Sequence, residues 1–392
     1  MKLKSYKSAK LKGKGVILRV ALETPITKTG GKFLVEDDTR LKVILPTIRY
    51  LLKNGCKIVL VSYAGRPQGK NVPELRLDPQ AEHLSKLLGK KVNKLSDCIG
   101  PQVEKIVGRM KAGDIVLLEN TRFHPEERAN DSNFAKALAK LGDIFINDAF
   151  AQSYEPHAST TAITNFLPSY AGPLLLSEVK MFSKVLEKPR RPWVAIIGGA
   201  KISNKIKVIK TLLKKADYVL LGGALANTIL TAQGIQVGKS LIEKEYVEIA
   251  KELKVTDIKL KIPVDVVVAT KKITPESKCR PVGAVQPDEI ILDIGPDTVE
   301  LYKMIINKAK TVVWNGPMGK YEMKEYSYGS IKIAEAIASA RADTFVGGGE
   351  TVDVIRDNKL EKKFDFISTG GGAMLKFLQY GTLPALKPLT IK

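Results

Sequence analysis

The sequence predicts an α/β protein of two lobes, each a parallel sheet wound by helices, joined by a hinge helix. Short runs rich in Val and Ile alternate with longer stretches of helical period along the chain. A proline-rich segment within residues 176–192 separates an earlier series of these runs from a later one. Glycine-rich turns follow most runs of the later series. Strand–helix alternation of this kind is typical of parallel sheets covered by helices.

The first lobe is predicted from four strand-like runs and one amphipathic helix. The runs are Val16–Val20, Lys57–Ser62, Asp114–Leu118 and Asp143–Asn147. Residues 38–54 place six Leu and Ile side chains on one stripe, as an amphipathic helix requires. Asp38 precedes this stripe as a candidate N-cap, and Gly55 stands where the helix would stop.

The second lobe is predicted from a further series. Its strand-like runs are Trp193–Ile197, Tyr218–Leu221, Val264–Ala269, Thr311–Trp314, Thr344–Val346 and Phe366–Ser368. Its helical patterns are Ile202–Lys215, Thr298–Ala309, Gly329–Ala340 and Gly371–Leu378. Between the lobes, an amphipathic segment runs into the proline-rich turn Lys188–Pro192. We therefore expect lobes at residues 1–175 and 193–380, with a hinge or connector at 176–192.

The composition excludes several classes of protein. Of the 392 residues, 44% are hydrophobic and 27% charged, unlike a disordered or collagen-like chain. The net charge of +22 would suit nucleic acid or a membrane surface. The lysines are scattered without a run of five or more, which instead favours a basic solvated surface or a protein that handles anionic metabolites.

The cysteines and the apolar runs indicate a soluble cytoplasmic protein. Cys56, Cys98 and Cys279 lie far apart, and the chain has only three histidines. This pattern predicts neither a zinc site nor a disulfide framework, and it fits a reducing compartment. No apolar run reaches the length of about 18 residues that crossing a bilayer requires. The basic N-terminus lacks the apolar core of a signal peptide.

Glycine-rich turns at the ends of second-lobe strands predict a phosphate-binding site. They are Gly198–Gly199, Gly222–Gly223, Gly316, Gly347–Gly349 and Gly370–Gly372. One such turn would indicate little, because glycine commonly serves only a tight turn. Several on one lobe favour phosphate, since helix N-termini at the carboxyl ends of strands direct N–H groups at anions. Lys201 and Lys205 would lie on one face of the predicted helix and add positive charge.

The segment Gly234–Ser240 is similar to a P-loop but is rejected as one. Three residues separate its glycines where the motif requires four, and it follows a helical pattern rather than a strand. No GxGxxG string occurs in the chain, which argues against a dinucleotide-binding enzyme.

Six segments together resemble the phosphoglycerate kinase family. They are Glu36–Arg40, Glu119–His124, Asn147–Phe150, Gly198–Lys205, Thr311–Gly319 and Ser368–Gly372. The resemblance covers nearly the whole chain and implies two Rossmann-like lobes. It also implies MgATP on the C-terminal lobe, an acyl-phosphate or carboxylate substrate on a basic patch of the N-terminal lobe, and a hinge motion that brings the two together. Residues 381–392 would form a tail that returns to the N-terminal lobe.

The resemblance implies a role for each matching residue on the nucleotide side. Lys205 would contact the transferring phosphoryl group, Lys201 the α and β phosphates, and Glu322 the ribose. Glu350 stands where the family has a magnesium-binding Asp, so it is the implied metal ligand unless it only caps a helix. The implied nucleotide-binding residues are Gly199, Lys201, Lys205, Asn315, Glu322, Gly348, Gly349, Glu350 and Thr351. The implied catalytic residues are Arg40, Lys205, Gly371 and Gly372.

The acceptor side departs from the family pattern. The implied substrate-binding residues, which are kept, are Arg40, Arg66 and Arg122. An Asp and an Asn that hydrogen-bond the glycerate in the family are replaced by Ala21 and Glu23. A His and a phosphate-binding Arg are replaced by Tyr63 and Glu155. The pocket thereby loses positive charge, which opposes a trianionic substrate and indicates an altered use.

These observations leave more than one function open. The leading hypothesis is reversible phosphoryl transfer in glycolysis between 1,3-bisphosphoglycerate with ADP and 3-phosphoglycerate with ATP. One alternative is a paralogue that phosphorylates a different, less anionic acceptor. Another is a nucleotide-binding protein without turnover, although such a protein has no need of Arg40. We expect a monomer that uses Mg²⁺ with ATP or ADP and a small phosphorylated substrate, with no nucleic-acid or membrane partner.

Overall fold

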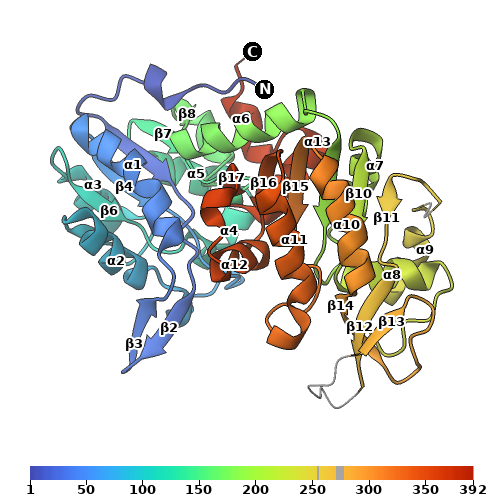
Figure 1. The fold of residues 1–392 in the computed structure, drawn as a ribbon. Coiled ribbons are helices and arrows are strands. Elements are labelled where there is room, and N and C mark those ends of the chain that lie inside the picture. Colours follow the sequence, from blue (N-terminus) through green and yellow to red (C-terminus); the bar gives the residue numbers. More distant parts are fainter. Residues whose placement is uncertain (254–255, 271–277, 392) are drawn as a thin grey trace. The chain divides into compact units, whose positions relative to one another are not determined.

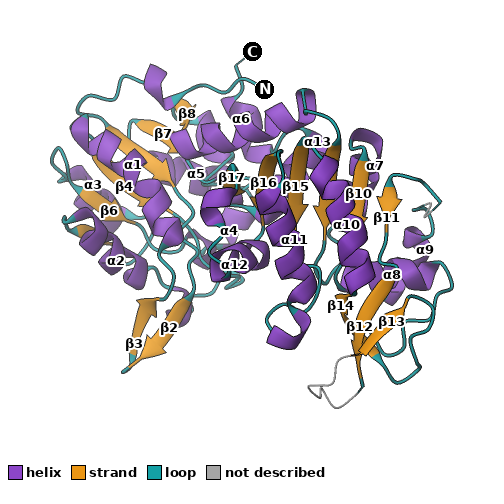
Figure 2. Ribbon diagram, in the orientation of Figure 1, coloured by secondary structure: helices purple, strands orange, loops and turns teal. Residues whose placement is uncertain are grey.

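A computed structural model describes residues 1–253, 256–270 and 278–391, and the chain divides into two compact units (Figure 1). Unit 1 contains Met1–Lys180 and Thr382–Lys392, and unit 2 contains Met181–Gly381. Each unit has a six-stranded sheet in which all neighbouring strands run parallel. Helices accompany the strands in both units (Figure 2). The predicted α/β class is therefore confirmed.

Unit 1 has the strand order β5-β6-β4-β1-β7-β8. Its strands are β1 (Gly15–Arg19), β4 (Lys57–Val61), β5 (Val92–Lys94), β6 (Ile115–Leu117), β7 (Ile144–Asn147) and β8 (Ser169–Ala171). A separate antiparallel hairpin contains β2 (Ile26–Thr29) and β3 (Lys32–Val35). Its helices are α1 (Thr39–Lys53), α2 (Asp78–Leu88), α3 (Pro101–Gly108), α4 (Pro125–Arg128) and α5 (Ser132–Ala139), and α6 (Pro173–Glu187) begins there.

The central strands of the unit 1 sheet are largely apolar because helices cover both of its faces. In β1, Val16 and Leu18 belong to a core cluster with residues of α1 and α2. Ile17, between them, belongs to the opposite cluster with residues of α3 and α5. Burial on both faces replaces the alternating pattern of a half-exposed strand with a continuous apolar run.

The predicted helix of residues 38–54 is α1, and Asp38 stands at its N-cap position as predicted, but without the expected capping hydrogen bond. The Asp38 side chain makes no capping hydrogen bond to the described backbone. Its carboxylate instead pairs with Lys42 and His83. The N–H of Thr39 bonds to the Asp37 carboxylate at 2.8 Å.

Unit 2 has the strand order β11-β10-β9-β15-β16-β17. These strands are β9 (Trp193–Ile197), β10 (Tyr218–Leu221), β11 (Leu260–Lys261), β15 (Thr311–Asn315), β16 (Asp343–Gly347) and β17 (Phe366–Ser368). A second, antiparallel sheet has the order β13-β12-β14, with β12 (Asp265–Ala269), β13 (Lys278–Pro281) and β14 (Ile290–Ile294). The helices are α7 (Ile206–Lys215), α8 (Ala224–Ala232), α9 (Val247–Ala250), α10 (Pro296–Lys308), α11 (Tyr328–Ser339), α12 (Gly349–Asp357) and α13 (Gly371–Tyr380).

Two predictions for unit 2 are wrong in part. The run Val264–Ala269 forms β12, but in the antiparallel sheet rather than the parallel one. The helix predicted from Ile202 begins only at Ile206, because the preceding turn is held by Glu243, whose carboxylate accepts the N–H and hydroxyl of Ser203. Lys201 therefore lies in the loop before the helix and Lys205 at its N-cap, so the two do not share a helix face.

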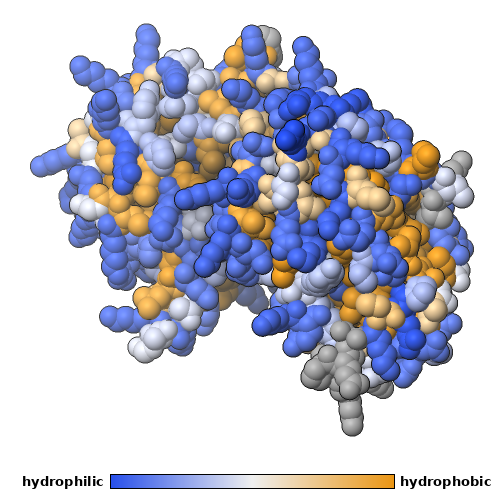
Figure 3. All heavy atoms as spheres, in the orientation of Figure 1, coloured by the Kyte–Doolittle hydropathy of each residue, from blue (hydrophilic) through white to orange (hydrophobic). Residues whose placement is uncertain are grey.

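The two ends of the chain lie side by side within unit 1. Leu3 pairs with Thr390, and the N–H of Lys4 donates to the Leu389 carbonyl at 2.8 Å. Hydrophilic side chains predominate on the face drawn in Figure 3. Among the described residues, none of the helices combines the length and apolar character needed to span a membrane.

Candidate active site

Glycine-rich turns follow five neighbouring strands of the unit 2 sheet. The strands β10, β9, β15, β16 and β17 are adjacent in that order, and each ends in one of the predicted glycine segments. Because these strands are parallel, all five turns lie at the carboxyl edge of one sheet. The predicted position of the glycine-rich turns is confirmed.

Two kinds of glycine occur at this edge. At Gly316, φ is +93° and an added Cβ would lie 2.3 Å from the Gly198 carbonyl oxygen, so the fold itself requires glycine. Gly349 and Gly372 differ, because neither has a left-handed φ and no described atom would lie within 4 Å of a Cβ there. They stand in the first turns of α12 and α13, where backbone N–H groups have no helical partner. A bare backbone at a helix N-terminus suits the close approach of an anion.

Lys205 lies against the first of these turns. It is the N-cap residue of α7, and its ammonium donates to the Gly198 carbonyl at 2.5 Å. Burial lowers the pKa of Lys205 to about 8, although the negative charge of Glu350 acts in the opposite direction. Lys201, by contrast, is exposed.

Asn315 and Thr351 connect neighbouring turns. The amide of Asn315 donates to the Gly347 carbonyl at 2.5 Å. The hydroxyl of Thr351 accepts the N–H of Gly316 at 2.7 Å. Both side chains are buried, so they hold the β15 and β16 turns together.

A cavity of about 470 Å³ adjoins the turns. Gly199, Glu322 and Glu350 of the predicted nucleotide residues lie in its wall. Further wall residues, which the sequence did not predict, include Asn227, Leu241, Val266, Ile291, Pro317 and Met318. A largely apolar cavity with a few polar groups is typical of a small-ligand site. The run that forms β12 was visible in the sequence, but its place in the cavity wall depends on the antiparallel sheet.

In unit 1, three arginines follow the carboxyl ends of strands or begin a helix. Arg40 stands in the first turn of α1, Arg66 follows β4, and Arg122 follows β6. Arg66 is exposed. Arg40 lies beside the Glu23 carboxylate, with Nη1 and Oε2 3.9 Å apart. Glu23 also accepts the N–H of Gly65 at 2.9 Å.

Arg122 is held among protein groups and is only 6% exposed. Its guanidinium carbon lies 3.5 Å from the ring centroid of Tyr63, a cation–π contact. Nη1 donates to the Gly65 carbonyl at 2.8 Å, and Nη2 lies 3.3 Å from Nε2 of His157. The guanidinium of Arg19 contacts the same Tyr63 ring from 5.0 Å. Sequence reasoning missed this stack, because its members come from four separate segments.

The parallel sheet and the glycine-rich turns at its carboxyl edge are typical of an α/β nucleotide-binding protein. The phosphoglycerate kinase family matches residues 6–380 of the chain. A phosphoglycerate kinase of Moorella thermoacetica is 45% identical over 99% of both chains, and one of Dictyoglomus turgidum is 46% identical over 97% of both. The phosphoglycerate kinase structure from Coxiella burnetii is similar with a TM-score of 0.84, at 36% identity over 99% of this chain and 98% of that one.

The structure of the Pyrococcus horikoshii phosphoglycerate kinase matches with a TM-score of 0.86, at 31% identity over 99% of this chain and 98% of that one. The chain belongs to the phosphoglycerate kinase family, as the sequence segments predicted. It is thus an ATP-dependent kinase of the type that phosphorylates a carboxyl group.

Proposed function

We propose that this chain transfers a phosphoryl group reversibly between 1,3-bisphosphoglycerate with ADP and 3-phosphoglycerate with ATP. The observation that supports this most is the bare backbone at Gly349 and Gly372, where the fold itself does not require glycine. Lys205, half-buried at the same edge, adds a charge in a partly desolvated environment. Fixed charges and N–H dipoles in such an environment stabilise developing negative charge strongly.

Each residue of this edge then has a distinct task. The adenosine enters the apolar cavity, with Glu322 at the ribose. Lys201 and the first turn of α12 bind the α and β phosphates. Lys205 and the first turn of α13 stabilise the group in transfer. No covalent protein intermediate is needed, because this chemistry depends on positioning and charge.

Glu350 is the residue that would hold Mg²⁺. Its carboxylate lies in the first turn of α12 and in the cavity wall, and carboxylate oxygen is a hard ligand of the kind Mg²⁺ prefers. When bound, Mg²⁺ neutralises phosphate charge. Glu350 also acts on the pKa of Lys205, so removing its charge would alter both sites.

A less anionic acceptor is the second candidate function. Arg122 already donates to Gly65 and stacks on Tyr63, and Arg40 lies beside Glu23. These arginines therefore offer less unpaired positive charge to a trianionic substrate than free guanidinium groups would. The Glu155 carboxylate adds negative charge where the family pattern has an Arg.

A coupled assay with ATP and 3-phosphoglycerate, beside calorimetry of nucleotide binding, tests both candidates. Turnover with 3-phosphoglycerate supports the first. Nucleotide binding without this turnover overturns it.

A second protein with Glu23→Asn, Tyr63→His and Glu155→Arg separates the acceptor question from the nucleotide question. We expect 3-phosphoglycerate to bind this variant roughly tenfold or more tightly, with unchanged ADP affinity. Equal 3-phosphoglycerate affinity of the two proteins would contradict the altered acceptor.

We further propose that the protein acts as a cytoplasmic monomer, because its small soluble substrates require neither a membrane nor a partner chain. Light scattering on the protein as it elutes from a size-exclusion column tests the monomer. A mass larger than that of one chain would contradict it.

A further inference from the structure

We propose that Asp97, Cys98 and His124 of unit 1 bind a divalent transition metal, with Zn²⁺ the best match to their chemistry. This site is separate from the residues of the proposed phosphoryl transfer. Within residues 1–253, 256–270 and 278–391, it is the one group of three Cys, His or carboxylate residues whose ligand atoms all lie within 4.8 Å of one another.

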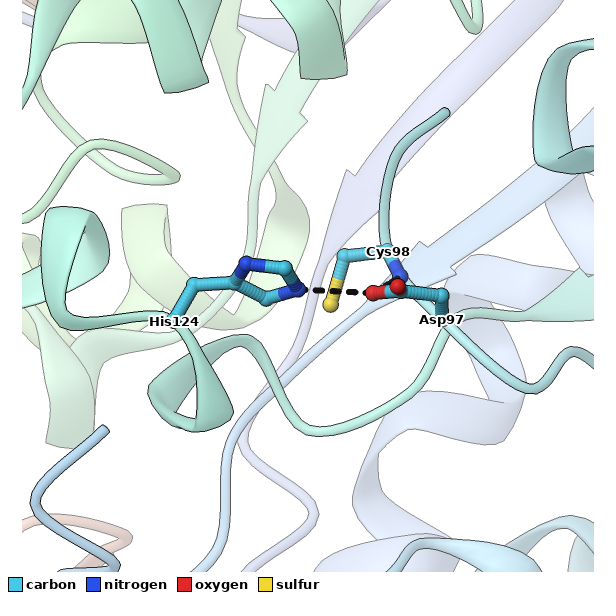
Figure 4. A group of neighbouring side chains, drawn as sticks. All are labelled: Asp97, Cys98 and His124. Atoms are coloured by element: carbon cyan, nitrogen blue, oxygen red, sulfur yellow. Dashed lines mark hydrogen bonds and ion pairs between the residues drawn. The ribbon is translucent and has the colours of Figure 1, made fainter. Parts of the chain in front are cut away.

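The three side chains converge from two loops. Asp97 and Cys98 precede α3, and His124 precedes α4. Figure 4 shows the His124 imidazole directed at the Asp97 carboxylate, with the Cys98 sulfur beside the line between them. The distance from His124 Nε2 to Asp97 Oδ1 is 2.7 Å. The sequence positions are too far apart to form a recognisable zinc-binding spacing.

The geometry requires little adjustment to hold a metal. Tetrahedral Zn²⁺ with bonds of about 2.0–2.3 Å keeps its ligand atoms roughly 3.3–3.8 Å apart. The three ligand atoms lie within 4.8 Å of one another, and His124 Nε2 and Asp97 Oδ1 lie 2.7 Å apart, so side-chain movements of about 1 Å would bring all three into this range.

The ligand types favour Zn²⁺ over Mg²⁺ or Ca²⁺. A thiolate and an imidazole suit transition metals, whereas the hard cations prefer oxygen alone. Cys98 is fully buried, but the Asp97 and His124 side chains are 51% and 26% exposed. A metal can therefore enter from the solvent side, where water supplies the fourth ligand.

Binding exchanges hydrogen bonds for metal bonds. The Cys98 thiol now donates to the Glu119 carbonyl at 3.0 Å, and it would release its proton to solvent as the sulfur–metal bond forms. His124 Nε2 would give up its hydrogen bond to Asp97 and release its proton to solvent, so that Nε2 binds the metal and Nδ1 carries the proton of the neutral ring. Asp97 would then bind the metal through its carboxylate, of which Oδ1 still accepts the N–H of Cys98 at 2.6 Å.

The chain contains a control residue for the histidine and another for the cysteine of the proposed site. His83 Nε2 pairs with Asp38 Oδ2 at 3.1 Å, a similar histidine–carboxylate pair that belongs to no such three-ligand group in the described structure. Cys279 is an exposed cysteine outside the described metal-ligand group. His83→Asn and Cys279→Ser therefore control for His124→Asn and Cys98→Ala.

The experiment is a titration of the chelator-treated full chain with Co²⁺, followed by competition with Zn²⁺. We expect one Co²⁺ per chain, a sulfur-to-cobalt charge-transfer band, and its loss when Zn²⁺ is added. Cys98→Ala should remove the band, and His124→Asn and Asp97→Asn should each weaken binding about tenfold or more. The two control variants should bind as the unmodified chain does.

Two results would overturn the proposal: absence of the band in the unmodified chain, or a band that persists in Cys98→Ala. The second would point to another thiol. Circular dichroism of every variant checks folding. If Cys98→Ala fails to fold, the test rests on His124→Asn, because His124 is partly exposed. Full metal affinity in a folded His124→Asn variant would refute the site.

Discussion

Lys205 is the residue whose proposed role depends most on its protonation. Burial brings its pKa to about 8, so the free enzyme loses this positive charge as the pH rises through that value. Because kcat/KM reports the ionisation of the free enzyme, we expect kcat/KM to fall above about pH 8. A Lys205→Arg variant keeps its charge at these pH values and should not show this fall, even if its overall rate is lower. We would measure the pH profile of kcat/KM for both proteins. The same decline in each would exclude Lys205 as the cause of the decline.

Removing the Lys205 side chain should affect the rate more than nucleotide binding. Its proposed contact is made mainly in the transition state, so Lys205→Ala should lower kcat about 100-fold or more. Calorimetry should give an ADP affinity changed by much less. An unchanged kcat in this variant would show that another group stabilises the phosphoryl group.

Gly372 allows a test in which stability and activity move in opposite directions. A Cβ there would meet no described atom within 4 Å, and the backbone is helical. Gly372→Ala should therefore stabilise the fold by about 0.4–1 kcal/mol, because alanine has less freedom in the unfolded chain.

The same methyl group would obstruct an anion at the first turn of α13, so phosphoryl transfer should fall by roughly tenfold or more. Gly108→Ala is the control, since Gly108 ends α3 in equally open surroundings. Urea unfolding and the coupled assay measure both effects. Full activity in Gly372→Ala would mean that no ligand approaches this turn.

At the scale of elements, the start of α6 depends on one buried carboxylate. Asp148 accepts the N–H groups of Leu174 and Leu175 at 2.8 and 3.0 Å, and the hydroxyl of Thr47 at 2.6 Å. Burial raises the pKa of Asp148 to about 6 despite these bonds. The folded state therefore holds this proton more tightly than the unfolded chain, and its contribution to stability declines as the pH rises from about 4 to about 6.

An Asp148→Asn variant removes this titration and keeps an oxygen acceptor for the helix. From pH 4 to pH 8, its free energy of unfolding should rise relative to the unmodified protein by about 3 kcal/mol at most. Far-UV circular dichroism during urea unfolding reports both units. Tryptophan fluorescence reports unit 2 alone, because Trp193 and Trp314 are the two tryptophans of the chain. A pH-independent difference between the proteins would contradict the role given to Asp148.

Element prediction succeeded where burial determines the pattern and failed where a distant partner decides. The apolar runs of β1 and β9 could be located because both are almost wholly buried. The start of α7 could not, since Glu243 holds the preceding turn from about 40 residues away. For β12, an apolar run does not reveal whether its neighbours are parallel or antiparallel.

For the site, the glycine turns could be predicted because parallel strands bring their carboxyl ends to one edge. The partners of Arg122 could not be predicted, because Tyr63 and His157 reach it from separate segments.

At the scale of the whole molecule, alternating strands and helices indicated two sheets. The lobe boundaries at 175 and 193 and the hinge stay predictions.

The proposed location of the nucleotide site in unit 2 has a consequence for the stability of the whole molecule. A ligand that binds only folded unit 2 stabilises that unit by mass action, by about 2.7 kcal/mol at a concentration 100 times its Kd. The indole N–H of Trp314 donates to the Gly316 carbonyl at 2.8 Å, so fluorescence detects unfolding at the glycine edge itself. MgADP should therefore raise the urea midpoint of unit 2, which fluorescence reports. The unfolding transition of unit 1, which only circular dichroism reports, should keep its midpoint. Glu350→Gln should reduce the difference between ADP with Mg²⁺ and ADP with chelator, since the carboxylate is the proposed ligand. Equal shifts of both transitions would show that the stabilisation extends beyond unit 2, and an unmoved fluorescence midpoint would place the nucleotide elsewhere.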